Sequence, residues 1–136
     1  MKVVIDTNVL VAAIGKTSPY RKIFDDLLSK KFVLILSNDI VMEYWEIIAR
    51  KSTDTIADNI IKSLLSASNV ELCTVFFNWN MIAADKEDNK FCDATIAANA
   101  DYLVTNDNHF NILKDIDFPK ISILSAKNFV EVLKTF

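Results

Sequence analysis

Glycine and proline are scarce in this sequence, with one Gly and two Pro among 136 residues. Such a composition leaves little room for long flexible loops or for linkers between domains. The lone Gly15 also excludes the glycine-rich phosphate-binding loops of the GxGxxG and Walker types, because these loops need several glycines at fixed spacing. Together with the length of the chain, this predicts a single domain that spans residues 1–136.

Cysteine and histidine are also rare. Cys73 and Cys92 lie far apart and form no CxxC pair, so we expect two ordinary buried or half-buried thiols rather than a disulfide framework or a zinc site. His109 is the only histidine, and the sequence contains no Ser-His-Asp or Cys-His arrangement that indicates nucleophilic catalysis. We expect His109 to be a surface or capping residue, with contact to a substrate as the alternative.

Long apolar runs and a positive net charge are missing as well. No apolar run reaches the roughly 18 residues of a membrane-spanning helix, and the N-terminus has no signal pattern, so we expect a soluble cytoplasmic protein. The net charge is −3 and the pI is about 5.1, which does not indicate simple electrostatic binding to nucleic acid or to lipid. For a polyanionic substrate, a bound metal or local Lys and Arg would have to supply positive charge.

Hydrophobic residues, at 51%, predict an ordered chain that buries roughly two thirds of its unfolded surface. Short β-branched runs alternate with longer helical stretches along the whole chain, which is typical of βα units. We therefore predict a three-layer α/β/α fold with a mostly parallel central sheet of about four to five strands. The predicted strands are residues 2–5, 32–36, 70–75, 102–105 and 121–124.

Two aspartates follow predicted strands directly. Asp6 comes after strand 2–5, and Asp107 comes just after strand 102–105. Ligands of open parallel sheets gather beyond the carboxyl ends of the strands, so two acids at equivalent ends indicate a functional site. Each aspartate alone is also compatible with a helix cap. Ser37, which follows the second strand, looks mainly like a cap.

Helix geometry adds three candidates. Asp93 shares one side of its helix with apolar residues, where an unpaired charge is costly to bury, although the helix dipole also favours an acid early in a helix. Asp88 begins the same helix and can lean toward the same edge of the sheet. Glu43 borders the apolar face of the predicted helix 39–51, where it is also compatible with a simple boundary position. We expect Asp85 and Glu87 to be surface charges.

Four or five carboxylates are thus predicted at one edge of the sheet. Clustered like charges raise one another's pKa unless a cation holds them. Oxygen ligands without His or Cys favour Mg²⁺ or Mn²⁺ over zinc.

Three stretches, "VVIDTNVLVAA", "SNDIVMEYWEII" and "DKEDNKFCDATIAANADYLVTND", resemble the PIN-domain nucleases, in particular the VapC-like toxin components of toxin–antitoxin systems. The resemblance spans nearly the whole chain. The sequence departs from the usual pattern of this family in two places: "DKED" replaces the more common "DPDD", and "TND" replaces "TGD". Both changes keep the acidic residues. These departures bear on loop shape and substrate fit more than on metal binding.

The resemblance implies a site made of the acids that match the motifs. The residues implied to hold the metal and to act in catalysis are Asp6, Glu43, Asp88, Asp93 and Asp107, with Thr7 and Asn8 as supporting residues. The implied function is a metal-dependent endoribonuclease that uses Mg²⁺ or Mn²⁺. The implied partners are an RNA substrate and an antitoxin protein, and we expect a homodimer. Arg21, Lys22 and Lys90 are candidate contacts to the RNA backbone.

The alternative is a catalytically silent PIN-like module that holds a divalent metal and a protein partner. A receiver-like domain is disfavoured because no clear Asp follows "VELCTV", and a DxD phosphatase is disfavoured because Asn8 stands where the second acid is needed.

The aromatic residues Trp45, Phe76, Phe77 and Trp79 indicate either a partner surface or core packing.

Overall fold

The computed structural model describes residues 1–136 and contains one five-stranded sheet. The strands are β1 (Lys2–Ile5), β2 (Val33–Leu36), β3 (Val70–Leu72), β4 (Tyr102–Val104) and β5 (Ile123–Leu124). Their order across the sheet is β3-β2-β1-β4-β5, and every neighbouring pair is parallel. The predicted mostly parallel sheet is therefore confirmed, with strands that are in most cases shorter than the apolar runs that predicted them.

The central strands β1 and β2 are apolar apart from Lys2 at the start of β1. The side chains of Val3–Ile5 in β1 and of Leu34–Leu36 in β2 are completely buried. Such continuous apolar runs are typical of parallel strands that are covered on both faces. The edge strands β3 and β5 contain no fully buried residue, because only one neighbour protects each of them.

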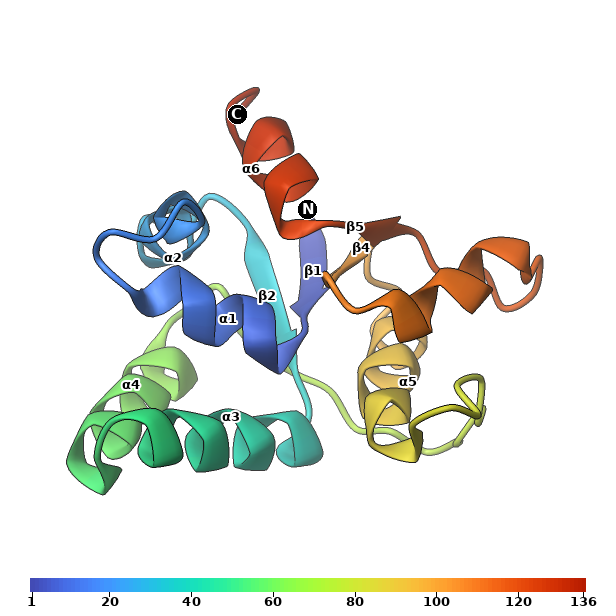
Figure 1. The fold of residues 1–136 in the computed structure, drawn as a ribbon, viewed down its shortest axis with the longest axis horizontal. Coiled ribbons are helices and arrows are strands. Elements are labelled where there is room, and N and C mark those ends of the chain that lie inside the picture. Colours follow the sequence, from blue (N-terminus) through green and yellow to red (C-terminus); the bar gives the residue numbers. More distant parts are fainter.

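Helices cover both faces of the sheet, which gives the three layers that the sequence predicts (Figure 1). Helix α5 packs against β1, β2 and β4, while α1 packs against α2 and α3, and α3 against α4. The helices are α1 (Thr7–Ile14), α2 (Arg21–Leu28), α3 (Asn38–Lys51), α4 (Asp54–Ser66), α5 (Asn89–Ala97) and α6 (Ala126–Leu133), with 3₁₀ helices η1 (Lys86–Asp88) and η2 (Asn108–Asp115). None of these helices is both long and apolar enough to cross a membrane.

Several helices begin where the sequence places a cap. The hydroxyls of Ser37, Thr53 and Ser125 each accept a hydrogen bond from a backbone N–H in the first turn of α3, α4 and α6. Such bonds provide an acceptor for backbone N–H groups of the first turn that have no partner within the helix. The caps at Ser37 and Ser125 lie where the chain leaves β2 and β5, and the cap at Ser37 marks the start of the helix that carries Glu43.

The order of the strands places a crevice beside β1. From β1 the chain moves outward to β2 and β3 on one side, and it then returns to build β4 and β5 on the other side. The two directions diverge between β1 and β4, and ligands of open parallel sheets bind at this switch point, beyond the carboxyl ends of the strands. Asp6 follows β1 here, and its backbone N–H donates to the carbonyl of Val104 at the end of β4 over 2.9 Å.

Candidate active site

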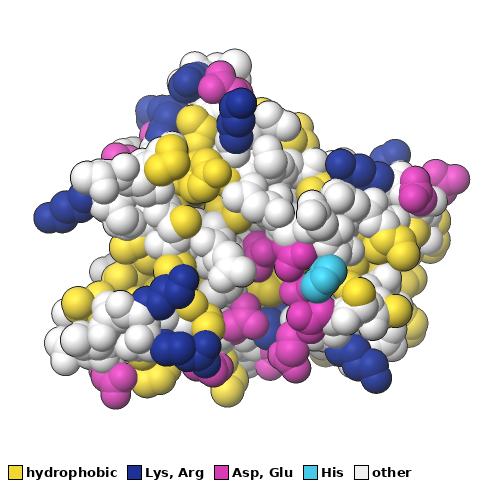
Figure 2. Space-filling view, in the orientation of Figure 1, with side chains coloured by type: hydrophobic (Ala, Val, Ile, Leu, Met, Phe, Trp, Pro, Cys, Tyr) yellow, Lys and Arg dark blue, Asp and Glu magenta, His cyan; other side chains and the backbone are white.

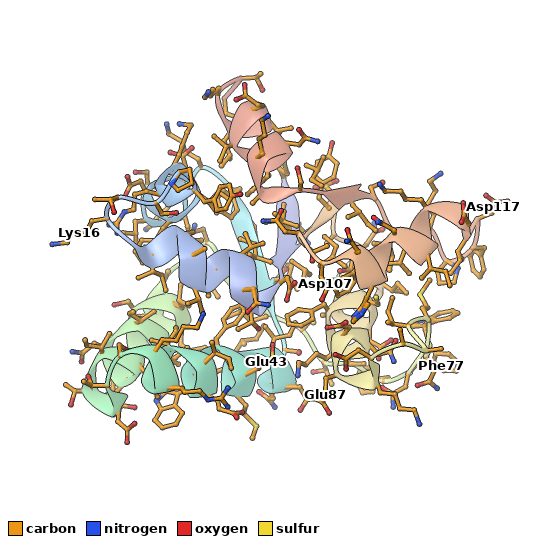
Figure 3. All side chains as sticks on the ribbon, in the orientation of Figure 1. Lys16, Glu43, Phe77, Glu87, Asp107 and Asp117 are labelled. Atoms are coloured by element: carbon orange, nitrogen blue, oxygen red, sulfur yellow. The ribbon has the colours of Figure 1, made fainter.

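An acidic cleft of about 230 Å³ opens at the switch point, and six of its nine lining residues are acidic. Figure 2 shows the acidic side chains gathered in the middle of one face of the molecule, with the histidine beside them. In Figure 3, Glu43, Glu87 and Asp107 lie around this cleft, far from Asp117 at the edge of the molecule. The lining residues are Asp6, Thr7, Asn8, Glu43, Ile47, Asp85, Glu87, Asp88 and Asp107.

Asp6 is the most buried acid of the cleft, with 6% of its surface exposed. Its side chain makes no capping hydrogen bond to α1. The pKa of Asp6 is raised from 3.8 to about 6. Burial is the largest cause, the hydrogen bond from Thr105 acts in the opposite direction, and the charges of Asp88, Asp107 and Glu43 add to the rise. The four carboxylates therefore act on one another electrostatically, and we call Asp6, Glu43, Asp88 and Asp107 the carboxylate cluster.

Thr105 joins two members of the carboxylate cluster and was missed from the sequence. Its buried hydroxyl donates to Oδ2 of Asp6 over 2.8 Å and accepts a hydrogen bond from the backbone N–H of Asp107 over 3.0 Å. The signal available in the sequence was a hydroxyl residue between the apolar strand and Asp107. Asp107 itself accepts from the backbone N–H of His109 over 2.9 Å, so it caps η2 and lines the cleft at once.

Glu43 reaches the cleft from α3 and is held through both of its carboxylate oxygens. Thr7 donates its hydroxyl hydrogen to Oε2, and Nζ of Lys90 lies 2.7 Å from Oε1. Glu43 is therefore part of a polar network rather than a simple boundary residue. Of the two predicted supporting residues, Thr7 is buried against Glu43, while Asn8 is exposed beside the cleft and makes no side-chain hydrogen bond.

Asp88 lies next to His109 at the rim of the cleft. Nδ1 of His109 is 3.2 Å from Oδ2 of Asp88 and 3.5 Å from Oδ1 of Asp107. The hydrogen bond with Asp88 raises the pKa of His109, and burial raises the pKa of Asp88. Asp85, which we expected to be a plain surface charge, comes close enough to Asp88 and His109 for these three side chains to surround an ion.

Asp93 lies in a different place. It is 5% exposed and lines an adjoining hollow of about 490 Å³ instead of the acidic cleft. Its Oδ1 accepts a hydrogen bond from the backbone N–H of Trp79 over 3.0 Å, and burial raises its pKa. Asp93 comes five positions after Asp88, a spacing that on a helix turns two side chains apart by about 140°. The structure thus brings Asp6, Glu43, Asp88 and Asp107 together in the cleft, whereas Asp93 lines the adjoining hollow, to which Glu43 also contributes.

The basic residues that were candidate RNA contacts are all engaged within the chain. Lys90 pairs with Glu43 and Glu87, Arg21 pairs with Asp25, and Lys22 pairs with Asp26. The cleft therefore offers no unpaired lysine or arginine of its own to a phosphate.

The donor set of the cleft fits a hard divalent cation. It offers carboxylate oxygens from several elements of the chain, no thiol, and one imidazole at the rim. Mg²⁺ and Mn²⁺ prefer such oxygen ligands. A bound cation would also relieve the mutual repulsion that contributes to the raised pKa of Asp6.

Comparisons with known proteins agree with this architecture. A family model described as PIN domain matches residues 2–109. No curated protein sequence matches the chain. The structure of VapBC2 from Rickettsia felis, bound to a DNA fragment from its promoter, is similar with a TM-score of 0.64 and 20% identity, covering 92% of this chain and 98% of the other.

A second similar structure is VapC20 from Mycobacterium tuberculosis, a toxin that cleaves the sarcin-ricin loop. Its TM-score is 0.60 at 14% identity, and the match covers 80% of this chain and 92% of the other. At these identities, the two structures show a shared fold.

Proposed function

This chain belongs to the PIN domain family, and from that premise we propose that it is a metal-dependent endoribonuclease that hydrolyses RNA phosphodiester bonds. The observation that carries the proposal is the meeting of Asp6, Glu43, Asp88 and Asp107 in one cleft at the switch point of the sheet. Carboxylates from four separate segments of the chain converge there, although like charges repel one another.

In this proposal, the carboxylate cluster holds Mg²⁺ or Mn²⁺ at the mouth of the crevice. A divalent cation bound by carboxylates supplies positive charge to a phosphate and lowers the pKa of water, as phosphodiester hydrolysis requires. Thr105 and Thr7 orient Asp6 and Glu43 through their hydroxyl groups. The resemblance implies Asp93 as a further ligand, but its Oδ1 accepts a hydrogen bond from the backbone N–H of Trp79, so we propose that it positions that segment.

We further propose that the protein is the toxin of a type II toxin–antitoxin pair. The resemblance to VapC-like sequences supports this, as does the fold that the chain shares with VapBC2 and VapC20. Its substrate would be an RNA, its site of action the cytoplasm, and its partners an antitoxin protein and a second copy of the chain. Residues 1–136 would form a single PIN-like domain, which agrees with their one sheet and one continuous apolar core.

An exposed aromatic surface supports a protein partner. Phe76 and Phe118 are almost fully exposed, and Phe77 and Phe118 each pack edge-on against the half-buried Trp79. Trp45, in contrast, packs against the apolar core and donates to Asp58 of α4 over 2.7 Å, so it does not belong to this surface. Clusters of exposed apolar residues of this kind mark interaction sites in soluble proteins.

Cleavage of a fluorescent single-stranded RNA tests the proposed activity directly. We expect cleavage with Mg²⁺ or Mn²⁺, no cleavage with EDTA, and a loss of at least about 100-fold in Asp6→Asn, since a ligand and its charge are removed. Asp117→Asn is the matched control, because Asp117 is exposed and lies far from the cleft. Cleavage that is insensitive to both EDTA and Asp6→Asn contradicts the proposal.

The second candidate is the catalytically silent PIN-like module that binds a divalent metal and a protein partner. The same exposed aromatic surface favours it, because such a surface serves binding without any need for catalysis. Metal binding without cleavage of any RNA tested would support this module over the nuclease.

A further inference from the structure

Lys90 is the only lysine or arginine that makes an ion pair with the carboxylate cluster. It lies in the first turn of α5, and only 14% of its side chain is exposed. Its Nζ is 2.7 Å from Oε1 of Glu43 and 3.2 Å from Oε2 of Glu87. A largely buried ammonium group thus lies beside the place where a divalent cation is proposed to bind.

Both oxygens of Glu43 already have a donor. Thr7 donates to Oε2 and Lys90 to Oε1. The two donors differ in their effect on an incoming cation. The hydroxyl of Thr7 is neutral and leaves a lone pair on its oxygen free, whereas the ammonium group of Lys90 repels a cation and occupies the other oxygen.

The side chain of Lys90 has both space and a second carboxylate partner besides Glu43. It lines the adjoining hollow of about 490 Å³ together with Asn78, Asn80 and Glu87. Glu87 is 81% exposed in its side chain and is already within ion-pair distance of Nζ. Lysine has four rotatable side-chain bonds, so Nζ can leave Oε1 while the backbone of α5 stays in place.

We propose that Lys90 is a built-in counter-ion of the site, which occupies Glu43 in the metal-free protein and is displaced from Oε1 when a divalent cation binds. This inference rests on the proposed function only in taking the acidic cleft as the metal site. Lys90 is therefore a positioning residue that sets the metal affinity through Glu43. Burial lowers the pKa of Lys90, but the hydrogen bonds and charges of Glu43 and Glu87 together outweigh this and raise it, so the group stays charged.

Titration of the metal-free protein with Mn²⁺, followed by the electron paramagnetic resonance signal of free Mn²⁺, tests the inference. We expect Lys90→Met to bind Mn²⁺ at least about tenfold more tightly than the wild type, because the loss of one charged hydrogen bond removes the competition for Glu43. Lys90→Arg keeps the charge and should stay within about threefold of the wild type. Lys90→Gln removes the charge with little change in size and serves if Lys90→Met does not fold.

Lys86→Met is the matched control. Lys86 lines the same hollow and carries the same charge, but it forms no ion pair with a carboxylate. Its Mn²⁺ affinity should stay close to that of the wild type. If Lys86→Met tightens binding as much as Lys90→Met does, the effect is one of net charge alone and the inference is wrong.

Thermal unfolding gives a second measurement that does not depend on activity. Without metal, Lys90→Met should unfold at a lower temperature than the wild type, because the carboxylate cluster has lost its one paired lysine. With saturating Mn²⁺, this difference should shrink. Unchanged or weaker Mn²⁺ binding by Lys90→Met overturns the inference, whereas a wild-type protein that binds no Mn²⁺ at all refutes the proposed function itself.

Discussion

The hydroxyl of Thr105 donates a hydrogen bond to Oδ2 of Asp6 over 2.8 Å, although the two residues are 99 positions apart in the sequence. The same hydroxyl accepts from the backbone N–H of Asp107. One buried side chain therefore sets the relative position of the acid that follows β1 and the acid that follows β4. These are the two strands between which the crevice of the sheet opens.

Thr105→Val should weaken the site more than it weakens the fold. Valine has nearly the same shape, but it leaves Asp6 and the N–H of Asp107 without their partner, at a cost of about 1–3 kcal/mol in the free energy of unfolding. The hydroxyl of Thr105 lowers the pKa of Asp6, so its loss should raise that pKa further. We expect metal-dependent cleavage to fall and the acid limb of its pH profile to move to higher pH.

Thr95→Val is the control for this prediction. Thr95 is also buried, and its hydroxyl donates to the carbonyl of Phe91 within α5, away from the carboxylate cluster. The variant should lose stability to a similar degree and keep the wild-type pH profile. Equal pH profiles for Thr105→Val and the wild type would show that the hydroxyl has only a structural role.

Asp88→Asn and Asp93→Asn should differ sharply. Asp88 belongs to the carboxylate cluster, so its amide variant should lose most Mn²⁺ affinity and cleavage. In Asp93→Asn, the amide oxygen can still accept the hydrogen bond from Trp79, so we expect near wild-type affinity and activity. Mn²⁺ titration of both variants checks this, and a larger loss in Asp93→Asn than in Asp88→Asn contradicts our assignment of the ligands.

The stability of the metal-free protein should depend on pH through Asp6. Its pKa is about 6 in the folded protein against 3.8 as its ordinary value. Between these values the folded state binds more protons than the unfolded state, so this group's contribution to stability falls as the pH rises from about 4 to about 6. The loss is about 3 kcal/mol at most, at about 1.4 kcal/mol per pKa unit.

Urea unfolding in EDTA at pH 4.5 and pH 7.5 measures this effect. Asp6→Asn lacks the titrating group, so the free energy of unfolding of the wild type minus that of the variant should be smaller at pH 7.5. Saturating Mn²⁺ should restore the wild type at pH 7.5, because a cation binds the ionised carboxylate. A difference that is equal at both pH values in EDTA would show that the pKa of Asp6 is not raised in the folded protein.

The sequence predicts most of the fold because local signals and burial agree. Apolar runs such as Leu34–Leu36 are strands, and Ser37, Thr53 and Ser125 cap the helices that follow them. The sequence was less informative between residues 73 and 85, where the predicted third strand ends at Leu72 and the chain continues without regular structure. The alternation of apolar residues predicts a strand there, but it does not show that this strand lies at the edge of the sheet, where it has backbone partners on one side only.

The site was only partly accessible from the sequence. Asp6 and Asp107 follow from the ends of the strands, but the choice between Asp88 and Asp93 depends on where α5 begins and how it is rotated. The pairing of Lys90 with Glu43 joins two helices, so no spacing along the chain could indicate it. The two hydroxyl contacts, from Thr105 and Thr7, depend on tertiary packing in the same way.

The most direct test is a crystal structure of the protein grown with Mn²⁺, with the metal located by anomalous scattering. We predict a peak in the acidic cleft, within about 2.5 Å of carboxylate oxygens from at least Asp6 and one other member of the carboxylate cluster, with Nζ of Lys90 no longer on Glu43. An empty cleft at saturating Mn²⁺, or a peak held by Asp93 in the adjoining hollow instead, would contradict the account.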